Sequence, residues 1–306
     1  MTRGLPDGLE RDVPLARLTT VRTGGPADYF AHAGSNARVV ELLAWAAAES
    51  VAVGVIGSGS NLLIADHGFQ GLVIKLNGHL SEIQIDADRV LCGGGARLPR
   101  VAARTADAGL AGLEFGVNIP GTVGGAIRMN ANAYGGELAA VLEWAEVAGP
   151  DGLGRRTPEQ LGFSYRHSNI AGGQIVTRAQ FKLKRERAAS VKAKLAALRD
   201  RRKAAQPGGI KTFGSTFKNP GDQRAAGHTA GQLLEAAGCK GLEVGGARFS
   251  PKHANFVENR GAATTADVVA LIAEGRARVR ESCGVVLETE VQVLGDVDPA
   301  LWEAGR

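Results

Sequence analysis

Val51-Ala-Val-Gly-Val-Ile-Gly-Ser-Gly-Ser-Asn61 is a β-rich run that ends in a loop of small residues, and the interpretation of the chain works outward from it. A helix is predicted just before this run, because apolar residues recur at helical spacing from Val39 to Ala47 and Asn36 can serve as the N-cap. Another strand is predicted at residues 71–76, after a turn. The alternation of helix and strand predicts a small α/β unit.

Downstream, the same alternation continues in a second, mixed α/β region. The Lys- and Ala-rich helix predicted from Arg187 to Ala205 ends at Gln206-Pro-Gly-Gly209, which is the clearest candidate boundary between domains. Thr229-Ala-Gly-Gln232 matches a capping box that opens a short helix. The remaining predicted elements are strands at 83–85, 89–92, 142–148, 174–183 and 285–294 and helices at 98–108 and 264–283, the last closed by Gly284.

The composition indicates a globular protein with an anionic partner. The chain has 306 residues, enough for two or three compact units, and 44% of them are hydrophobic. Its 43 glycines are about twice the usual share of roughly 7%, which indicates many tight turns. The formal charge of +5 favours anionic ligands, but the basic run from Lys182 to Lys203 has helical spacing and no interleaved aromatics. We therefore expect a small phosphorylated ligand and no nucleic acid.

The cysteines and the apolar runs of the sequence indicate the cellular compartment and whether a metal site is present. Cys92, Cys239 and Cys283 are too few and too scattered for a disulfide framework, and no CxxC motif or Cys/His cluster is present to bind zinc. The start of the sequence has no apolar signal segment, and no apolar run approaches the roughly 20 residues of a membrane span. We expect a cytoplasmic protein with no bound metal and no membrane partner.

Two glycine-rich loops are candidates for binding phosphate. In Gly57-Ser-Gly-Ser-Asn61, successive backbone N–H groups can form a nest for pyrophosphate oxygens. The loop is not the G-x-G-x-x-G dinucleotide fingerprint, because Asn61-Leu-Leu-Ile64 is apolar and β-prone rather than helical. Pro120-Gly-Thr-Val-Gly-Gly125 supplies the second loop. Two such loops in separate α/β units suit a long dinucleotide, and two unrelated glycine turns are the alternative.

A third segment, Gly214-Ser-Thr-Phe-Lys-Asn-Pro220, combines a hydroxyl, an ammonium and a side-chain amide. These three segments belong to a series of motifs that occur in order along nearly the whole chain. The series resembles the UDP-N-acetylenolpyruvoylglucosamine reductase family, in its shorter form without an extra tyrosine-bearing loop. The other motifs are Thr20-Val-Arg-Thr-Gly-Gly-Pro-Ala27, Leu113-Glu-Phe115, Ser164-Tyr-Arg-His-Ser168, His253-Ala-Asn-Phe256 and Leu287-Glu-Thr-Glu290.

This resemblance implies an α+β fold of the vanillyl-alcohol-oxidase/PCMH flavin type. FAD would be bound by two α/β subdomains, residues 1–78 and 79–186, with a substrate-binding domain at 187–284. A final strand within 285–306 would return to the first subdomain. His67 and His167 do not lie in motifs that attach FAD covalently, so a dissociable FAD is expected, with NADPH as co-substrate.

Members of the family reduce UDP-N-acetylglucosamine enolpyruvate to UDP-N-acetylmuramate, a precursor of peptidoglycan. NADPH would pass a hydride to flavin N5, and the substrate would take it at C3, which leaves a carbanion-like C2 to be protonated. Ser215 matches the proton donor, Arg166 the arginine that would clamp the carboxylate, and Glu290 the catalytic glutamate. Each residue also has a structural alternative. Ser215 would be a turn serine, Arg166 would form a surface salt bridge, and Glu290 would lie on a polar strand face.

Binding roles are also implied by the resemblance. Some assignments have plain alternatives, because Gln232 also fits the capping box and a buried His253 is often a satisfied core group. The residues expected to bind FAD are Gly57, Ser58, Gly59, Ser60, Asn61, Leu62, Pro120, Gly121, Thr122, Gly124, Gly125 and Asn130. Those expected to bind the substrate are Tyr165, Lys218, Asn219, Gln232, His253 and Asn255.

One departure from the family concerns Met129-Asn-Ala-Asn-Ala-Tyr-Gly135, where Asn132 replaces the usual glycine. We expect the turn to survive, because asparagine tolerates a left-handed backbone better than most residues. Two other functions stay open on the sequence: a sugar-acid or aldonolactone oxidase of the same fold, and a non-catalytic nucleotide-binding protein. A monomer or weak oligomer is expected.

Overall fold

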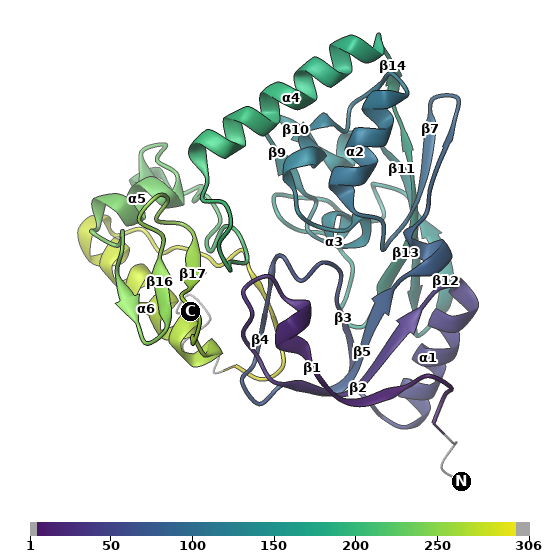
Figure 1. The fold of residues 1–306 in the computed structure, drawn as a ribbon, viewed down its shortest axis with the longest axis horizontal. Coiled ribbons are helices and arrows are strands. Elements are labelled where there is room, and N and C mark those ends of the chain that lie inside the picture. Colours follow the sequence, from purple (N-terminus) through teal and green to yellow (C-terminus); the bar gives the residue numbers. More distant parts are fainter. Residues whose placement is uncertain (1–4, 298–306) are drawn as a thin grey trace. The chain divides into compact units, whose positions relative to one another are not determined.

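The computed structural model describes residues 5–297, which form two compact units (Figure 1). Unit 1 comprises the N-terminal segment up to Asp12 together with residues 28–58 and 70–204. Unit 2 comprises residues 13–27 and 59–69 and the chain from Ala205 onward. The chain therefore passes from one unit to the other several times, and one of these passages, between Ser58 and Gly59, lies inside the first glycine loop.

The first sheet of unit 1 has the strand order β1-β2-β5-β3, and β3 runs parallel to β5. Helix α1 buries Val39, Leu42 and Trp45 in a core shared with Ala31 and Leu72 of this sheet. The elements are β1 (Glu10–Pro14), β2 (Pro26–Ala33), α1 (Asn36–Ala48), β3 (Val53–Val55) and β5 (Phe69–Leu76).

The predicted cap of α1 is wrong by one residue. Ser35 is extended, with φ −145° and ψ 160°, and its hydroxyl accepts from the backbone N–H of Arg38 at 3.3 Å, so Ser35 is the N-cap. Asn36 is already helical. Its side-chain Nδ2 instead donates to Glu146 Oε1 at 2.7 Å, which ties the helix to the second sheet of unit 1.

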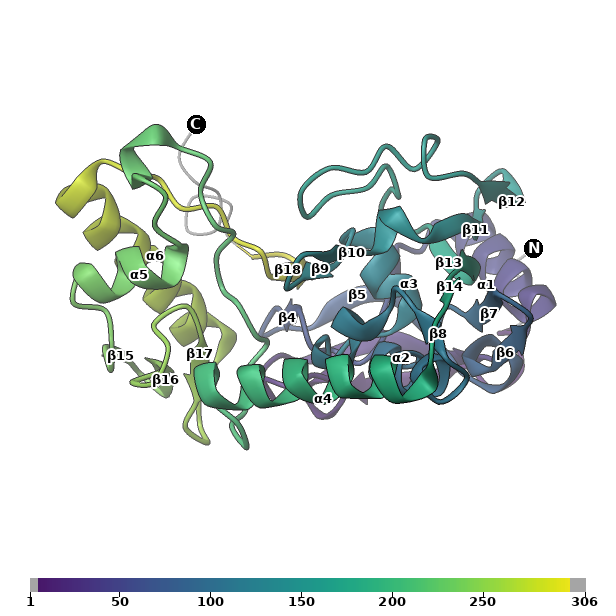
Figure 2. The same cartoon turned by 90° about the horizontal axis from the view of Figure 1, so that it is seen from above.

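That second sheet has five strands in the order β12-β11-β13-β7-β6, and every neighbouring pair is antiparallel. Helix α4 lies alongside α2, where Val191 and Leu195 pack on Ala102 and Ala106 (Figure 2). The elements are β6 (Ile83–Asp86), β7 (Arg89–Gly93), α2 (Leu98–Asp107), β8 (Leu110–Ala111), α3 (Val123–Arg128), β9 (Asn132–Ala133), β10 (Gly136–Glu137), β11 (Leu142–Gly149), β12 (Gly152–Arg156), β13 (Ile175–Lys182), β14 (Lys184–Arg185) and α4 (Ala188–Ala205).

Unit 2 packs two helices, α5 and α6, and a three-stranded antiparallel sheet around its own core. Helix α5 opens with the capping box expected at Thr229, and α6 opens with a second capping box at Thr264 that was not predicted. As predicted, α6 is closed by Gly284, with φ 72°. The elements are β4 (Leu62–Ile64), α5 (Ala230–Ala236), β15 (Glu243–Val244), β16 (Ala247–Phe249), β17 (Val257–Asn259), α6 (Thr265–Cys283) and β18 (Gln292–Leu294).

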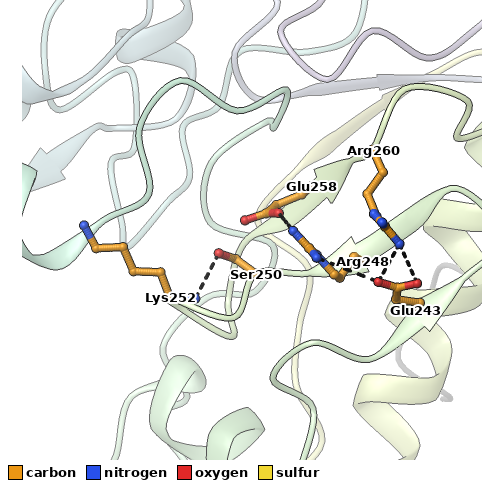
Figure 3. A network of polar contacts seen from close by, with 6 residues as sticks. All are labelled: Glu243, Arg248, Ser250, Lys252, Glu258 and Arg260. Atoms are coloured by element: carbon orange, nitrogen blue, oxygen red, sulfur yellow. Dashed lines mark hydrogen bonds and ion pairs between the residues drawn. The ribbon is translucent and has the colours of Figure 1, made fainter.

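A network of ion pairs crosses the three-stranded sheet of unit 2 (Figure 3). Arg248 on β16 contacts Glu258 on β17 at 2.6 Å and Glu243 on β15 at 3.8 Å, and Arg260 contacts Glu243 at 2.8 Å. Glu258 is 6% exposed, so its carboxylate needs this partner. The network therefore holds three very short strands in register.

The strand predicted at 285–294 is shorter in the structure, because the segment changes partner along its length. Residues 288–290 pair with the segment around Phe217, and only β18 continues as a strand, parallel to β4. The resemblance implies a domain boundary at residue 187, which would place α4 in the substrate-binding domain. In the structure α4 packs on α2 and belongs to unit 1. The three-part division stays a prediction.

Candidate active site

The two glycine loops meet within unit 1 at a single pair of residues. A Cβ on Gly57 would lie 2.5 Å from Thr122 Oγ1, so only glycine allows this approach. Thr122 also caps α3, because its hydroxyl accepts from Gly125 N at 3.4 Å. Gly124 N donates to Gly94 O at 2.8 Å, which adds a third glycine run to the cluster. These contacts bring the three glycine-rich segments together.

Two buried polar atoms, one in the first loop and one just after α3, have no hydrogen-bond partner among the described residues. They are Ser58 Oγ and Asn130 Oδ1. The amide nitrogen of Asn130 is used, since it donates to Glu137 Oε1 at 2.6 Å and Ser164 O at 3.1 Å. Leaving a buried donor or acceptor unpaired costs about 1–3 kcal/mol. A ligand with hydrogen-bonding groups, such as a dinucleotide, would satisfy both atoms.

Lys75 is a component of this region that was not predicted from the sequence. Its Nζ donates to Gly57 O, and burial together with the nearby Arg97 guanidinium lowers the pKa of the lysine. The cation is therefore fixed to the first glycine loop from β5. The signal in the sequence was a lysine at the end of the apolar run 71–74, where strand alternation alone gives it no role.

The segment Gly214–Pro220 in unit 2 lies between two other extended segments. On one side Thr216 N donates to Asn255 O at 2.8 Å, and Ser215 forms a bridge with Phe256. On the other side Glu290 N donates to Thr216 O at 2.8 Å. This pairing brings the backbones that carry Ser215 and Glu290 next to each other.

The end of the first glycine loop joins the same cluster in unit 2. Asn61 Nδ2 donates to Glu290 O at 3.2 Å, and Gln292 N donates to Asn61 O at 3.1 Å. A Cβ on Gly214 would lie 3.8 Å from Ser60 O. Ser60, Asn61 and Leu62, predicted to bind the cofactor, thus lie in the same unit as the predicted proton donor and glutamate.

Asn255 and His253, both predicted to bind substrate, hold the backbone around this segment. The Asn255 amide accepts from Phe217 N and donates to Phe217 O, each at 2.9 Å, and the residue is 4% exposed. His253 Nδ1 accepts from Asn255 N at 3.3 Å, and burial lowers the pKa of its imidazole. These contacts give both residues a positioning role, and direct contact with the substrate stays a prediction.

The other three residues predicted to bind substrate in unit 2 also have partners. Lys218 forms an ion pair with Glu288 at 3.3 Å, and the side-chain Oδ1 of Asn219 accepts from Ala230 N at 3.1 Å. Gln232 Oε1 accepts from Thr229 N at 2.8 Å, as its capping box requires. The Lys218 pair is partly exposed, and such pairs contribute about 0–1 kcal/mol. A phosphate can therefore replace Glu288 as the partner of this cation.

Tyr165 and Arg166 form the turn of a short hairpin in unit 1, closed by a bridge between Ser164 and His167. Arg166 has a left-handed backbone, with φ 55°. Its Nη1 donates to Asn132 O at 3.1 Å, and its guanidinium carbon lies 5.5 Å from the Tyr165 ring centroid. The third predicted catalytic residue is thus held by the segment in which the chain departs from the family that it resembles.

The turn after Asn132 is present, but Asn132 itself does not use the left-handed conformation that asparagine tolerates. Asn132 lies in β9 and pairs with Glu137, and the left-handed residues nearby are Asn130, Tyr134 and Gly135. An extended backbone accepts any side chain, so the replacement of glycine by asparagine imposes no backbone strain at this position. Asn132 supplies its carbonyl to Arg166, and any residue would do so.

The predicted site residues fall into two groups, one in each unit. Within residues 5–297, no group of three or more His, Cys, Asp or Glu side chains that could hold a metal ion is present, and none of the described helices is long and apolar enough to cross a membrane. Unit 1 contains Gly57, Ser58, Pro120, Gly121, Thr122, Gly124, Gly125, Asn130, Tyr165 and Arg166, and unit 2 contains Gly59, Ser60, Asn61, Leu62, Ser215, Lys218, Asn219, Gln232, His253, Asn255 and Glu290.

Comparison with known proteins identifies both parts of the chain. Residues 27–157 match the model of an FAD binding domain, and residues 206–294 match the C-terminal domain of UDP-N-acetylenolpyruvoylglucosamine reductase. The reductase of Anaeromyxobacter dehalogenans (strain 2CP-C) is 43% identical over 94% of this chain and 86% of its own length. That of Agathobacter rectalis is 43% identical over 97% of both chains.

A solved structure supports the same assignment for the fold. The crystal structure of the reductase from Thermus caldophilus has a TM-score of 0.80 and 37% identity, and it covers 94% of this chain and 98% of its own. The predicted α+β fold, with an FAD-binding part followed by a C-terminal domain, is confirmed. This chain therefore belongs to the UDP-N-acetylenolpyruvoylglucosamine reductase family.

Proposed function

We propose that this protein is an FAD-dependent reductase that converts UDP-N-acetylglucosamine enolpyruvate to UDP-N-acetylmuramate with NADPH, in the synthesis of peptidoglycan precursors. One structural observation carries the cofactor half of this proposal. The glycine loops touch at Gly57 and Thr122, and two buried atoms, Ser58 Oγ in the first loop and Asn130 Oδ1 just after α3, lack partners among the described residues. A bare backbone surface with unpaired polar atoms suits a dinucleotide.

The residues present fit FAD. Backbone N–H groups of Gly57 and Ser58 and the hydroxyl of Thr122 would hold its pyrophosphate, while Asn130 would hydrogen-bond a polar edge of the cofactor. Lys75 would hold the first loop through Gly57 O and add positive charge beside it. When bound, FAD supplies the chemistry by accepting a hydride from NADPH and delivering it to C3 of the enolpyruvyl group.

Ser215 is the proposed proton donor to C2 of the substrate. Its backbone is fixed by pairing with Phe256 on one side, and the adjacent Thr216 accepts from Glu290 N on the other. A serine hydroxyl is a weak acid, so it needs a strongly basic acceptor and polar groups nearby. Glu290 is proposed to hydrogen-bond the developing enol, and the backbone pairing gives Ser215 and Glu290 a common frame.

Arg166 is proposed to bind the substrate carboxylate through a charge-assisted, bidentate contact. The left-handed backbone at Arg166 costs about 1–2 kcal/mol in a residue with a side chain. Such conformations cluster at functional sites, because the surrounding structure must hold them. Lys218 and Asn219 are proposed to meet the phosphates or the sugar of the UDP group.

We further propose that the protein works in the cytoplasm, where NADPH and nucleotide sugars are available, as a monomer or weak oligomer. The test of the function is a steady-state assay in which NADPH oxidation is followed with and without UDP-N-acetylglucosamine enolpyruvate, and the product is identified by mass. Substrate-dependent formation of UDP-N-acetylmuramate supports the proposal. NADPH oxidation that proceeds equally with oxygen alone would instead support an oxidase.

A further inference from the structure

Arg276 is a buried arginine on α6 that the proposed function does not use. The residue is 9% exposed, whereas Arg280, one turn further along the helix, is exposed. Burial lowers the pKa of the Arg276 guanidinium, because desolvation penalises its charged form. A Cβ on the neighbouring Gly275 would lie 2.7 Å from ring atoms of Phe249, so glycine lets this part of α6 approach the core of unit 2 closely.

Arg276 contacts both segments that carry proposed catalytic groups. Its Nε donates to Leu287 O at 3.0 Å, three residues before Glu290. Its guanidinium carbon lies 5.9 Å from the ring centroid of Phe217, two residues after Ser215. Phe217 is 1% exposed, so this contact is also buried. A single side chain from α6 therefore reaches the Ser215 segment and the Glu290 segment.

These two segments are paired with each other by few bonds. Phe217 forms an isolated bridge with Thr289, with backbone bonds from Glu290 N to Thr216 O and from Lys218 N to Glu288 O. The Lys218–Glu288 ion pair, which is partly exposed, is a further link between the segments. So short a pairing does not by itself fix the relative position of two side chains. A group that contacts both segments from a rigid helix can do so.

We propose that Arg276 is a positioning residue that holds the Ser215 segment against the Glu290 segment for protonation of the substrate. This inference rests on the proposed function. A methionine would fill most of the same volume but would not donate to Leu287 O. A lysine would keep the charge but not the planar guanidinium that reaches the carbonyl and the aromatic ring together. A displacement of a catalytic group by about 1 Å costs on the order of 10²-fold in rate.

The experiment compares Arg276→Met, Arg276→Lys and the matched control Arg280→Met as purified FAD-loaded proteins. The two half-reactions are followed separately by flavin absorbance under anaerobic conditions. In Arg276→Met, we expect reoxidation by the enolpyruvyl substrate to slow about 10²-fold, with flavin reduction by NADPH within about twofold of the unmodified protein. The solvent deuterium isotope effect on reoxidation should rise, because proton donation becomes limiting. Arg276→Lys should restore part of the rate.

Arg280→Met should leave both half-reactions unchanged. If Arg276→Met does not fold, the rate and isotope effect of Arg276→Lys decide the question. The inference is overturned if neither variant changes reoxidation, if both half-reactions slow equally, or if the isotope effect does not move. Failure of the proposed function is a different result, because the unmodified protein itself would then show no reoxidation by the substrate.

Discussion

Lys75 contacts the backbone of the first glycine loop, which is part of the proposed cofactor site. Its ammonium binds the carbonyl of Gly57, so it acts on the conformation of the loop rather than through a motif of its own. The lowered pKa of Lys75 reports the cost of holding a cation in a partly buried place next to Arg97. That cost is offset if an anionic group binds nearby.

Lys75→Met is expected to weaken FAD binding by roughly tenfold to a hundredfold. The reason is that a hydrogen bond from a charged donor contributes about 1.5–3 kcal/mol, and about 1.4 kcal/mol corresponds to a factor of ten. The measurement is a fluorescence titration of FAD-stripped protein. Lys182→Met on β13, where the lysine is exposed, is the matched control. Equal affinities of the two variants for FAD would show that Lys75 does not contribute to FAD binding.

Asn132 provides a second test at the scale of one residue. Because its backbone is extended, restoring the family's glycine relieves no strain. Asn132→Gly is expected to lower the free energy of unfolding by about 0.5–1 kcal/mol, since glycine loses more conformational freedom on folding. Urea denaturation with a constant m-value measures the change. A more stable variant would show that the asparagine is strained.

Among the elements, the turn that leads into β17 depends on a neutral histidine. His253 Nδ1 accepts from Asn255 N, and the Asn255 amide in turn holds the backbone of Phe217. Burial lowers the pKa of His253 in the folded state, so the unfolded chain binds a proton at a higher pH than the folded chain. This group's contribution to stability is fully present above its unfolded pKa of about 6.5 and is lost as the pH falls through the folded value.

The free energy of unfolding should therefore fall below about pH 6.5, and His253→Gln should show a smaller fall. The difference between the two proteins, measured by urea denaturation from about pH 8 to about pH 5, isolates His253 because the other histidines cancel. A constant difference across this range would mean that the protonation of His253 is not linked to folding.

Local signals were enough to predict the helices of unit 2. The capping box at Thr229 and the glycine at 284 act within a few residues, and the structure confirms both. The strand at 285–294 was predicted too long, because its partners change from the Phe217 segment to β4. The alternation of apolar and polar residues does not indicate which segments a strand pairs with. The cap of α1 was misplaced because Ser35 and Asn36 are both good capping residues.

At the scale of the whole molecule, the site residues come from segments far apart in the chain. Glycine content and motif order were enough to predict the loops and the family, since both are visible in the sequence. Lys75 and Arg276 were not predicted, because Lys75 acts through the carbonyl of Gly57, and Arg276 through the carbonyl of Leu287 and the ring of Phe217. No local motif marks these contacts in the sequence. The division between units at Ser58 and Gly59 was also not visible, because it depends on which segments pack together.

The proposed catalytic residues are divided in the same way, with Arg166 in unit 1 and Ser215 and Glu290 in unit 2. Reduction of the flavin by NADPH does not need the proton donor, whereas reduction of the substrate does. The rate of flavin reduction therefore tests the proposed cofactor site, and the rate of substrate reduction tests the proposed role of Ser215.

The most direct measurement is an anaerobic stopped-flow record of flavin absorbance at about 450 nm. We predict that NADPH bleaches the flavin and that UDP-N-acetylglucosamine enolpyruvate restores its absorbance. In Ser215→Ala, bleaching should be nearly unchanged and restoration slower by about 10²–10⁴-fold, while the remote control Ser190→Ala behaves as the unmodified protein. A flavin that only oxygen reoxidises would contradict the function, and equal slowing of both steps in Ser215→Ala would contradict the role of the serine.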